Sequence, residues 1–176
     1  MISVTIDSIR VDLRNHQQVV VLKEESEERY LPIWIGPAEA NAIAIRLQGA
    51  EVHRPLSHDL ICSVIEDLGA KVDSVVIAEL RSNTFYAEII LKVDGEELQV
   101  DSRPSDALAL AVRTQSPIFV EESVLDEAGI WLDKETGMPI SGSGRSREVS
   151  QEELRRMSAF TDFINTLDLD DINKDE

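Results

Sequence analysis

Apolar and polar residues alternate along the start of the chain. The alternation over residues 2–13, interrupted near Ser8, predicts a strand with a bulge. Two apolar, β-branched runs follow at 19–22 and 30–35, and the segment that joins them is acidic. Such a pattern is typical of a hairpin with a solvated tip. We therefore expect three consecutive strands at the start of the chain.

A second set of strands is expected in the middle of the chain. Residues 72–80 are mostly apolar and predict one strand. Residues 85–93 and 98–101 flank the pair Asp94-Gly95, which is a strong signal for a tight hairpin turn. A short apolar run at 117–120 predicts one further strand. The middle of the chain therefore repeats the strand-rich character of its start.

Helical periodicity replaces alternation in four places. The segments expected to be helical are 37–47, 57–68, 103–113 and 121–128. Proline near the start of the first and third segments suits the first turn of a helix, where its missing N–H costs nothing. The third segment is rich in alanine and leucine and is apolar on nearly all sides. We expect that helix to be buried.

Two parts of the chain align with each other. Residues 36–46 match 103–113, with proline, an acid and arginine in equivalent positions, and residues 6–11 match 72–77. This repetition predicts two similar β-β-β-α halves packed around a pseudo-twofold axis. The expected fold class is α+β, with mixed sheets and packed helices. In such an arrangement we expect the two helix starts that carry proline and an acid to approach each other.

The composition changes in the last quarter of the chain, and this change marks the end of the expected domain 1–133. Residues 134–148 are rich in glycine, serine and arginine and predict a flexible linker. A capping box then begins an amphipathic helix expected over 149–167, whose apolar face must dock on the body or on another subunit. Residues 168–176 form an acidic tail.

The formal net charge of −17 restricts the partners of the chain. Such a surface repels nucleic acid and anionic membranes at long range, so a polyanionic substrate has to meet a local basic group or a bound cation. The single cysteine, Cys62, lies in an apolar helical pattern, which favours a buried thiol and a reducing compartment. The sequence shows neither a secretory signal nor an apolar run of membrane-spanning length, and we expect a cytoplasmic protein.

Charged residues gather at the starts of three predicted helices. The three segments contain Glu39 after Gly36-Pro37, then Arg54, His58 and Asp59 around Pro55, and finally Asp101, Arg103 and Asp106 around Pro104. Charged groups at the mouth of a buried helix serve either as caps or as a site. The residue types alone leave both interpretations open.

In combination these segments resemble the bifunctional nuclease domain family. The residues that carry the resemblance are Leu31–Gly36 with Glu39–Ala40, Arg54–Pro55 with His58–Leu60, Asp101 with Arg103–Ala111, and Pro117–Val120. The resemblance covers about residues 2–133. Ser57 stands where the family more often has threonine, and Leu108 where it more often has isoleucine. The resemblance implies a compact α+β domain, a homodimer, and hydrolysis of RNA and DNA.

Phosphodiester hydrolysis needs an activated water and neutralisation of the charge that builds on phosphate. Carboxylates bind Mg²⁺ or Mn²⁺, guanidinium groups pair with phosphate, and histidine carries protons. The candidate catalytic residues are Asp101, Asp106, Asp59 and His58; the candidate metal ligands are Glu39, Asp101 and Asp106; and the candidate phosphate-binding residues are Arg54 and Arg103. Our first hypothesis is a dimeric, divalent-metal-assisted nuclease of low sequence specificity that binds its RNA or DNA substrate weakly and does not act at a membrane.

Each candidate also has a structural explanation. Acids in the first turn of a helix are favoured by the helix dipole, and arginines that precede proline can pair with those acids and fix the loops. His58, at a helix start, fits a surface histidine. Trp34, Phe85 and Tyr86 fit the core or a dimer interface better than a base-stacking surface.

Two alternative functions are consistent with these structural explanations. One is a non-catalytic dimeric interaction or regulatory module, which would contact a partner protein through its C-terminal helix. The other is a small-anion sensor that uses Arg54 and Arg103. The sequence contains no zinc-type Cys/His spacing, no glycine-rich phosphate loop and no serine triad motif.

Overall fold

The computed structural model describes residues 1–11, 17–132 and 139–140. The chain forms two units, Met1–Gly129 and Ile130–Glu176. All the candidate site residues belong to the first unit.

The first unit begins with an antiparallel meander of three strands. Its strands are β1 (Ile2–Val11), β2 (Gln18–Glu24) and β3 (Arg29–Ile35). The register between β1 and β2 shifts between Ile6 and Ser8, which confirms the irregularity expected near Ser8. The acidic segment predicted to be a hairpin tip joins β2 to β3.

A second antiparallel meander occurs later in the chain. Its strands are β4 (Ala70–Arg81), β5 (Thr84–Val93) and β6 (Glu96–Ser102). Asp94 and Gly95 connect β5 to β6 with φ angles of 51° and 87°. Two successive positive φ angles are the mark of the type I′ hairpin turn, so the prediction from the Asp-Gly pair is confirmed.

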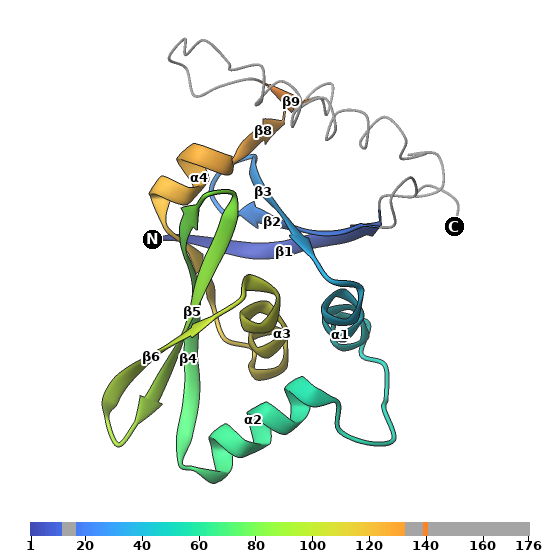
Figure 1. Cartoon of the computed structure of the whole chain (residues 1–176), viewed down its shortest axis with the longest axis vertical. Coiled ribbons are helices and arrows are strands. Elements are labelled where there is room, and N and C mark those ends of the chain that lie inside the picture. Colours follow the sequence, from blue (N-terminus) through green and yellow to red (C-terminus); the bar gives the residue numbers. More distant parts are fainter. Residues whose placement is uncertain (12–16, 133–138, 141–176) are drawn as a thin grey trace. The chain divides into compact units, whose positions relative to one another are not determined.

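One short strand joins the two meanders into a single mixed sheet. Strand β7 (Ile118–Val120) pairs parallel with β4 and antiparallel with β1. Within the first unit the strand order is β6-β5-β4-β7-β1-β2-β3. The α+β class with a mixed sheet is therefore confirmed, and Figure 1 shows β1 and β4 crossing beside the helices.

Four helices accompany this sheet in the first unit. They are α1 (Pro37–Leu47), α2 (Ser57–Asp67), α3 (Pro104–Thr114) and α4 (Glu122–Ala128). Helix α3 contacts α1, α2, β4 and β5, and Figure 1 shows it between the second meander and α1. Seven of its residues are buried, which confirms the burial expected from its composition. None of the helices in the described ranges is long and apolar enough to cross a membrane.

Each meander leads into a helix whose first residue is proline, as the aligned segments predict. The duplication itself and its pseudo-twofold axis stay predictions. In the second unit, β8 (Ile130–Leu132) pairs antiparallel with β9 (Pro139–Ile140), so two residues of the predicted linker 134–148 form a strand. The rest of that linker, the helix predicted over 149–167 and the acidic tail 168–176 lie outside the described residues.

Replacement of Leu108 by alanine tests the central position of α3. Leu108 is 0% exposed, and its truncation deletes buried methyl groups and leaves a cavity. Leu108→Ala should lower the free energy of unfolding by about 2–5 kcal/mol, measured by urea denaturation. Leu98→Ala is the matched control, because Leu98 is 53% exposed on β6. We expect the control to change stability by no more than about 0.5 kcal/mol, and equal losses at the two positions would contradict this assignment.

Candidate functional site

The starts of α1 and α3 meet through one guanidinium group. Arg103 is the residue before α3, and its Nη2 lies 2.9 Å from Oε1 of Glu39, in the first turn of α1. Its Nε donates to Oδ2 of Asp106, in the first turn of α3, at 2.8 Å. The approach of the two helix starts, expected from the internal repeat, is therefore present. A single arginine bridges two carboxylates from different helices.

Helix α2 adds a histidine to this arrangement. Nε2 of His58 lies 3.0 Å from Oδ1 of Asp106, so both oxygens of that carboxylate have partners. His58 is only 8% exposed, whereas the sequence favoured a surface histidine as its structural explanation. We call Glu39, His58, Arg103 and Asp106 the Arg103 cluster. It joins the first turns of three helices.

Two members of the Arg103 cluster, Asp106 and Arg103, have pKa values shifted in the direction that favours their charged forms. Burial opposes ionisation of Asp106, but the hydrogen bonds from His58 and Arg103 outweigh it and hold the pKa of Asp106 below its usual value. The hydrogen bonds to Asp106 and Glu39 raise the pKa of Arg103 above its usual value. The side chain of Arg103 nevertheless remains 66% exposed, compared with 29% for Asp106 and 18% for Glu39. The guanidinium is thus the part of the cluster that solvent reaches most easily.

Glycine at position 36 makes room for the Glu39 carboxylate. A Cβ added to Gly36 would collide with Oε2 of Glu39, which folds back over the residue that precedes α1. The lack of a side chain at Gly36 leaves room for this position of the Glu39 carboxylate, in which Arg103 contacts it.

Asp59 belongs to a different arrangement. Its Oδ2 accepts a hydrogen bond from the backbone N–H of Leu56 at 2.8 Å and so caps α2, and its Oδ1 accepts one from Nε of Arg113 at 2.7 Å. Arg113 is 5% exposed at its side chain and also donates to the backbone carbonyls of Ala42 in α1 and Ala109 in α3. The Asp59–Arg113 pair therefore ties three helices together.

The same pair defines how α2 begins. Asp59 supplies the side chain that caps α2, and Ser57 is the first residue of the helix. Burial opposes ionisation of Asp59, but the Leu56 N–H and Arg113 outweigh it and hold the pKa of Asp59 below its usual value. Arg113 lies in the last turn of α3, where a basic residue also suits the helix dipole, so the sequence carries no specific signal of its contact with Asp59.

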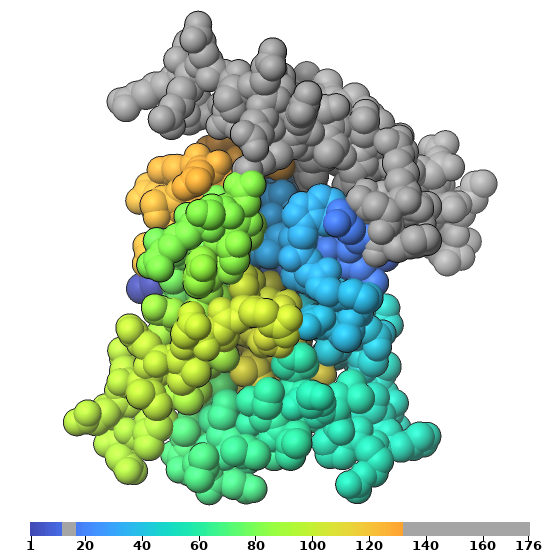
Figure 2. Space-filling view, viewed as in Figure 1, coloured from blue at the N-terminus to red at the C-terminus, as the bar shows by residue number. Residues whose placement is uncertain are grey.

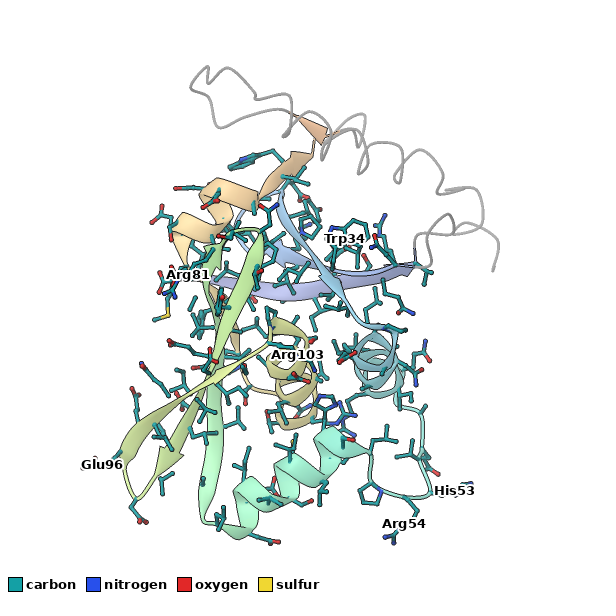
Figure 3. All side chains as sticks on the ribbon, viewed as in Figure 1. Trp34, His53, Arg54, Arg81, Glu96 and Arg103 are labelled. Carbon is teal, nitrogen blue, oxygen red and sulfur yellow. The ribbon has the colours of Figure 1, made fainter. Side chains whose placement is uncertain are left out.

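Arg54 and Asp101 lie apart from the Arg103 cluster. Arg54 is an exposed residue between α1 and α2, and Figure 3 shows it far from Arg103. Asp101 is exposed on β6, where its backbone partner in the ladder is Glu88 of β5. Neither residue shares an ion pair with the cluster among the described side chains. The catalytic or phosphate-binding roles predicted for these two residues stay predictions.

The cluster as arranged does not fit a divalent metal ion. Arg103 already lies between the two carboxylates that the sequence proposes as ligands, and His58 shares Asp106 with it. Among the described residues no group of three or more His, Cys, Asp or Glu side chains is placed to hold a metal. A cation at this position would have to displace the guanidinium first, so we assign no chemical step to a metal here.

A groove of about 420 Å³ lies beside Arg103. It runs between the end of β3, the start of β5 and the start of α3, and its lining includes Trp34, Ile35, Gly36, Thr84, Phe85 and Arg103. Figure 2 shows the junction of β6 and α3, in yellow, at the surface between the blue residues of the first half and the green residues of the second meander. Trp34 is 50% exposed there, which rules out the core position, while the dimer-interface position stays a prediction.

Residues 20–133 match the family model described as the bifunctional nuclease domain. The chain belongs to the bifunctional nuclease domain family. An uncharacterized protein of Mycobacterium tuberculosis (strain ATCC 25618 / H37Rv) is 40% identical over 168 residues, which is 96% of each chain. The resemblance found in the sequence is therefore confirmed, and both the Arg103 cluster and most of the groove lie within the matched residues.

Plant members of the family are more distant and longer. Bifunctional nuclease 1 of Oryza sativa subsp. indica is 26% identical over 122 residues, which is 68% of this chain and 37% of the plant protein. Bifunctional nuclease 2 of Oryza sativa subsp. japonica is 30% identical over 118 residues, which is 65% of this chain and 36% of the plant protein. This chain thus spans little more than a third of these plant relatives.

Replacement of Asp59 by asparagine should produce a pH-dependent loss of stability. A carboxylate whose pKa is lowered by folding stabilises the folded state above its unfolded-state pKa, and this stabilisation is lost as the pH falls through the folded-state pKa. Asp59→Asn should therefore lower the free energy of unfolding by about 1.5–3 kcal/mol at neutral pH. The difference from wild type should shrink at acidic pH, where wild-type Asp59 is itself protonated.

Urea unfolding measured from pH 7 down to about pH 3 checks this prediction. Asp73→Asn is the matched control, because Asp73 forms an exposed ion pair with Lys92 at 2.6 Å. Exposed pairs of this kind contribute about 1 kcal/mol or less. A loss at Asp59 that is the same at all pH values would show that its charge does not stabilise the helices.

Proposed function

We propose that this chain is a nuclease that hydrolyses phosphodiester bonds of RNA and DNA with low sequence specificity at the Arg103 cluster. Membership of the bifunctional nuclease domain family supports the proposal, as do the names of the plant relatives. The observation that carries it is an exposed guanidinium held between two carboxylates, one of which is bonded to a histidine, at the wall of a groove.

Arg103 is suited to bind the phosphate that is attacked. Its guanidinium has five N–H donors in a planar fork, and the contacts with Glu39 and Asp106 leave several of them available. A guanidinium aimed at phosphate neutralises charge that increases as the bond to the leaving oxygen breaks. The two carboxylates fix the orientation of Arg103 before substrate arrives, so little ordering remains to be done when phosphate binds.

His58 and Asp106 are suited to move protons. Hydrolysis adds water across the bond between phosphorus and an ester oxygen, so a proton must leave the water and another must reach the leaving oxygen. The contact between Nε2 of His58 and Oδ1 of Asp106 fixes the orientation of the ring, and histidine and aspartate are both residue types that transfer protons in hydrolysis. Glu39 supplies a further carboxylate, which contacts Nη2 of Arg103.

Replacement of Arg103 tests this function directly. Arg103→Ala should lower kcat/KM on single-stranded RNA and DNA by about 100-fold or more, because it removes the charge that stabilises the transition state. Arg103→Lys should recover only part of the activity, since an ammonium lacks the planar fork. The measurement is initial-rate cleavage of end-labelled oligonucleotides by purified protein.

Lys92→Ala is the control for loss of a positive charge. Lys92 is ion-paired with a carboxylate as Arg103 is, but it lies near the far end of β5 from Thr84 at the groove. We expect this variant to cleave like wild type. Equal trace cleavage by wild type, Arg103→Ala and Lys92→Ala would indicate a contaminating nuclease and would remove the support for the enzyme.

The same assay tests the predicted assistance by Mg²⁺ or Mn²⁺. Each protein is measured after EDTA treatment and again after either ion is added back. Activity that survives EDTA assigns charge neutralisation to Arg103. Activity that is lost and then restored by an ion supports the sequence prediction of a metal-assisted enzyme. The metal ligands would then be residues other than Glu39 and Asp106, which Arg103 already contacts.

A second candidate function is an interaction module, and the surface of α2 favours it. The apolar residues of this helix that remain exposed are Leu60 at 59%, Ile61 at 42%, Val64 at 48% and Leu68 just beyond it at 75%. A contiguous exposed apolar face is characteristic of a contact with another protein. We propose that a second copy of the chain covers it, which is the homodimer that the family resemblance implies.

The double variant Leu60→Glu, Val64→Glu tests this contact. Two carboxylates on the exposed face would be buried without partners in a dimer, so the variant should sediment as a monomer under conditions in which wild type sediments as a dimer. Leu98→Glu, which places the same charge at an exposed position on β6, is the control and should leave the mass unchanged. A wild-type monomer, or a double variant that remains dimeric, would contradict the assignment of α2.

A further inference from the structure

Trp34 is a half-exposed tryptophan on the side of β3 that faces away from the core. Along β3, Leu31 and Ile33 are 0% and 1% exposed and contribute to the core, whereas Trp34 points to the other side of the strand and is 50% exposed. Tryptophan is highly buried in most proteins, so a half-exposed tryptophan side chain is unusual and indicates a binding role. Because Leu31 and Ile33 supply the contacts of β3 with the core, a polar residue at position 34 would be compatible with the strand.

Trp34 lies beside groups that could bind a nucleotide with it. Trp34 and Arg103 line the same groove, and Phe85 lines it from the start of β5. Figure 3 shows Trp34 and Arg103 on neighbouring parts of the molecule, above and below the end of β3. An aromatic surface next to a guanidinium matches the two chemical parts of a nucleotide, because a base stacks on an indole and a phosphate pairs with a guanidinium.

We propose that Trp34 is a stacking platform for an unpaired base, so that the groove binds single-stranded nucleic acid with the neighbouring phosphate on Arg103. This inference rests on the proposed nuclease function, and it adds the form of the substrate and a residue that binds it. A base in a duplex is already stacked and paired, and it reaches a side chain only after both contacts are broken. The groove therefore favours single strands, loops and frayed ends.

The negative net charge of the protein indicates that a bound nucleic acid strand contacts it through few phosphates. With a net charge of −17, the surface repels a long polyanion, and attraction has to come from a local cation such as Arg103. Stacking does not depend on charge, so it supplies affinity where ionic contacts are scarce. We expect a shallow salt dependence, with a slope of log K against log salt of about −0.7 for one phosphate of a single strand.

Equilibrium binding measured by fluorescence anisotropy tests the proposal. The probes are a labelled eight-nucleotide single strand with phosphorothioate linkages that resist cleavage, an abasic strand with the same number of phosphates, and a blunt duplex. Trp34→Ala should weaken binding of the base-containing strand about tenfold and leave binding of the abasic strand unchanged. Trp34→Phe should retain most of the affinity, and the duplex should bind no better than the abasic strand.

Two variants provide the controls. Tyr86→Ala removes an exposed aromatic residue that follows Phe85 on β5, points to the opposite face of the strand and does not line the groove. It should leave binding of all three probes unchanged. Arg103→Ala should weaken binding of the base-containing and abasic strands by the same factor, because each offers the same phosphate. Because half of the Trp34 side chain is buried, Trp34→Ala should lose some stability, and thermal unfolding checks that the variant is fully folded at the temperature of the binding assay.

The outcomes separate this inference from the proposed function. If Trp34→Ala binds all probes like wild type while Arg103→Ala abolishes cleavage, the stacking platform is wrong and the nuclease stands. If Trp34→Ala loses affinity only for the base-containing strand while cleavage is absent from every protein, the platform stands and the nuclease fails. Equal weakening for base-containing and abasic strands would also overturn the platform.

Discussion

The burial of α3 on all sides is the constraint on which the rest of this structure depends. Seven of its residues are buried, and it contacts α1, α2, β4 and β5. A helix without a polar face needs cover from every direction, and two helices and a sheet supply it. Its first turn is then the place where charged residues can lie beside one another and still reach solvent. The Arg103 cluster is the result of that packing.

Helix starts attract acids for a reason that does not involve catalysis. The positive end of each helix dipole favours Glu39 in α1, Asp59 in α2 and Asp106 in α3. The Arg103 cluster differs from the Asp59–Arg113 pair in the solvent exposure of its arginine. Arg113 is 5% exposed and satisfied by two backbone carbonyls, whereas Arg103 is 66% exposed beside a groove. The same residue types therefore serve as a structural tie in one place and as a reachable charge in the other.

Local patterns predicted the elements of the fold because each carries its own signal. Alternation located the strands, and Asp94-Gly95 located a turn that needs positive φ angles. The turn at Ser82 and Asn83 also has two positive φ angles, 46° and 65°, but it lacks glycine, so its sequence carried a weaker signal. The position of β7 between β4 and β1 was not predictable. A strand of three apolar residues contains no pattern that specifies which strands it will pair with.

The candidate site was predictable where two helix starts carry the same pattern of proline and acid. The match between the two helix starts led to the expectation that Glu39 and the start of α3 approach each other. Asp101 stands only two residues before Arg103 in the sequence, yet the β6 ladder places it opposite Glu88 and outside the cluster. The Asp59–Arg113 contact joins residues 54 positions apart, and no spacing rule connects them. Whether Asp101 and Asp59 join the cluster depends on the directions of their side chains in the folded chain, which the sequence does not specify.

The late position of β7 in the chain has a consequence for synthesis on the ribosome. A nascent chain that has emerged only as far as residue 117 contains both meanders but lacks Ile118–Val120, the strand that pairs with β1 and β4. Until then the two half-sheets each present an open edge of unpaired backbone groups, and such edges recruit other chains. Closure of both edges therefore has to wait until β7 emerges.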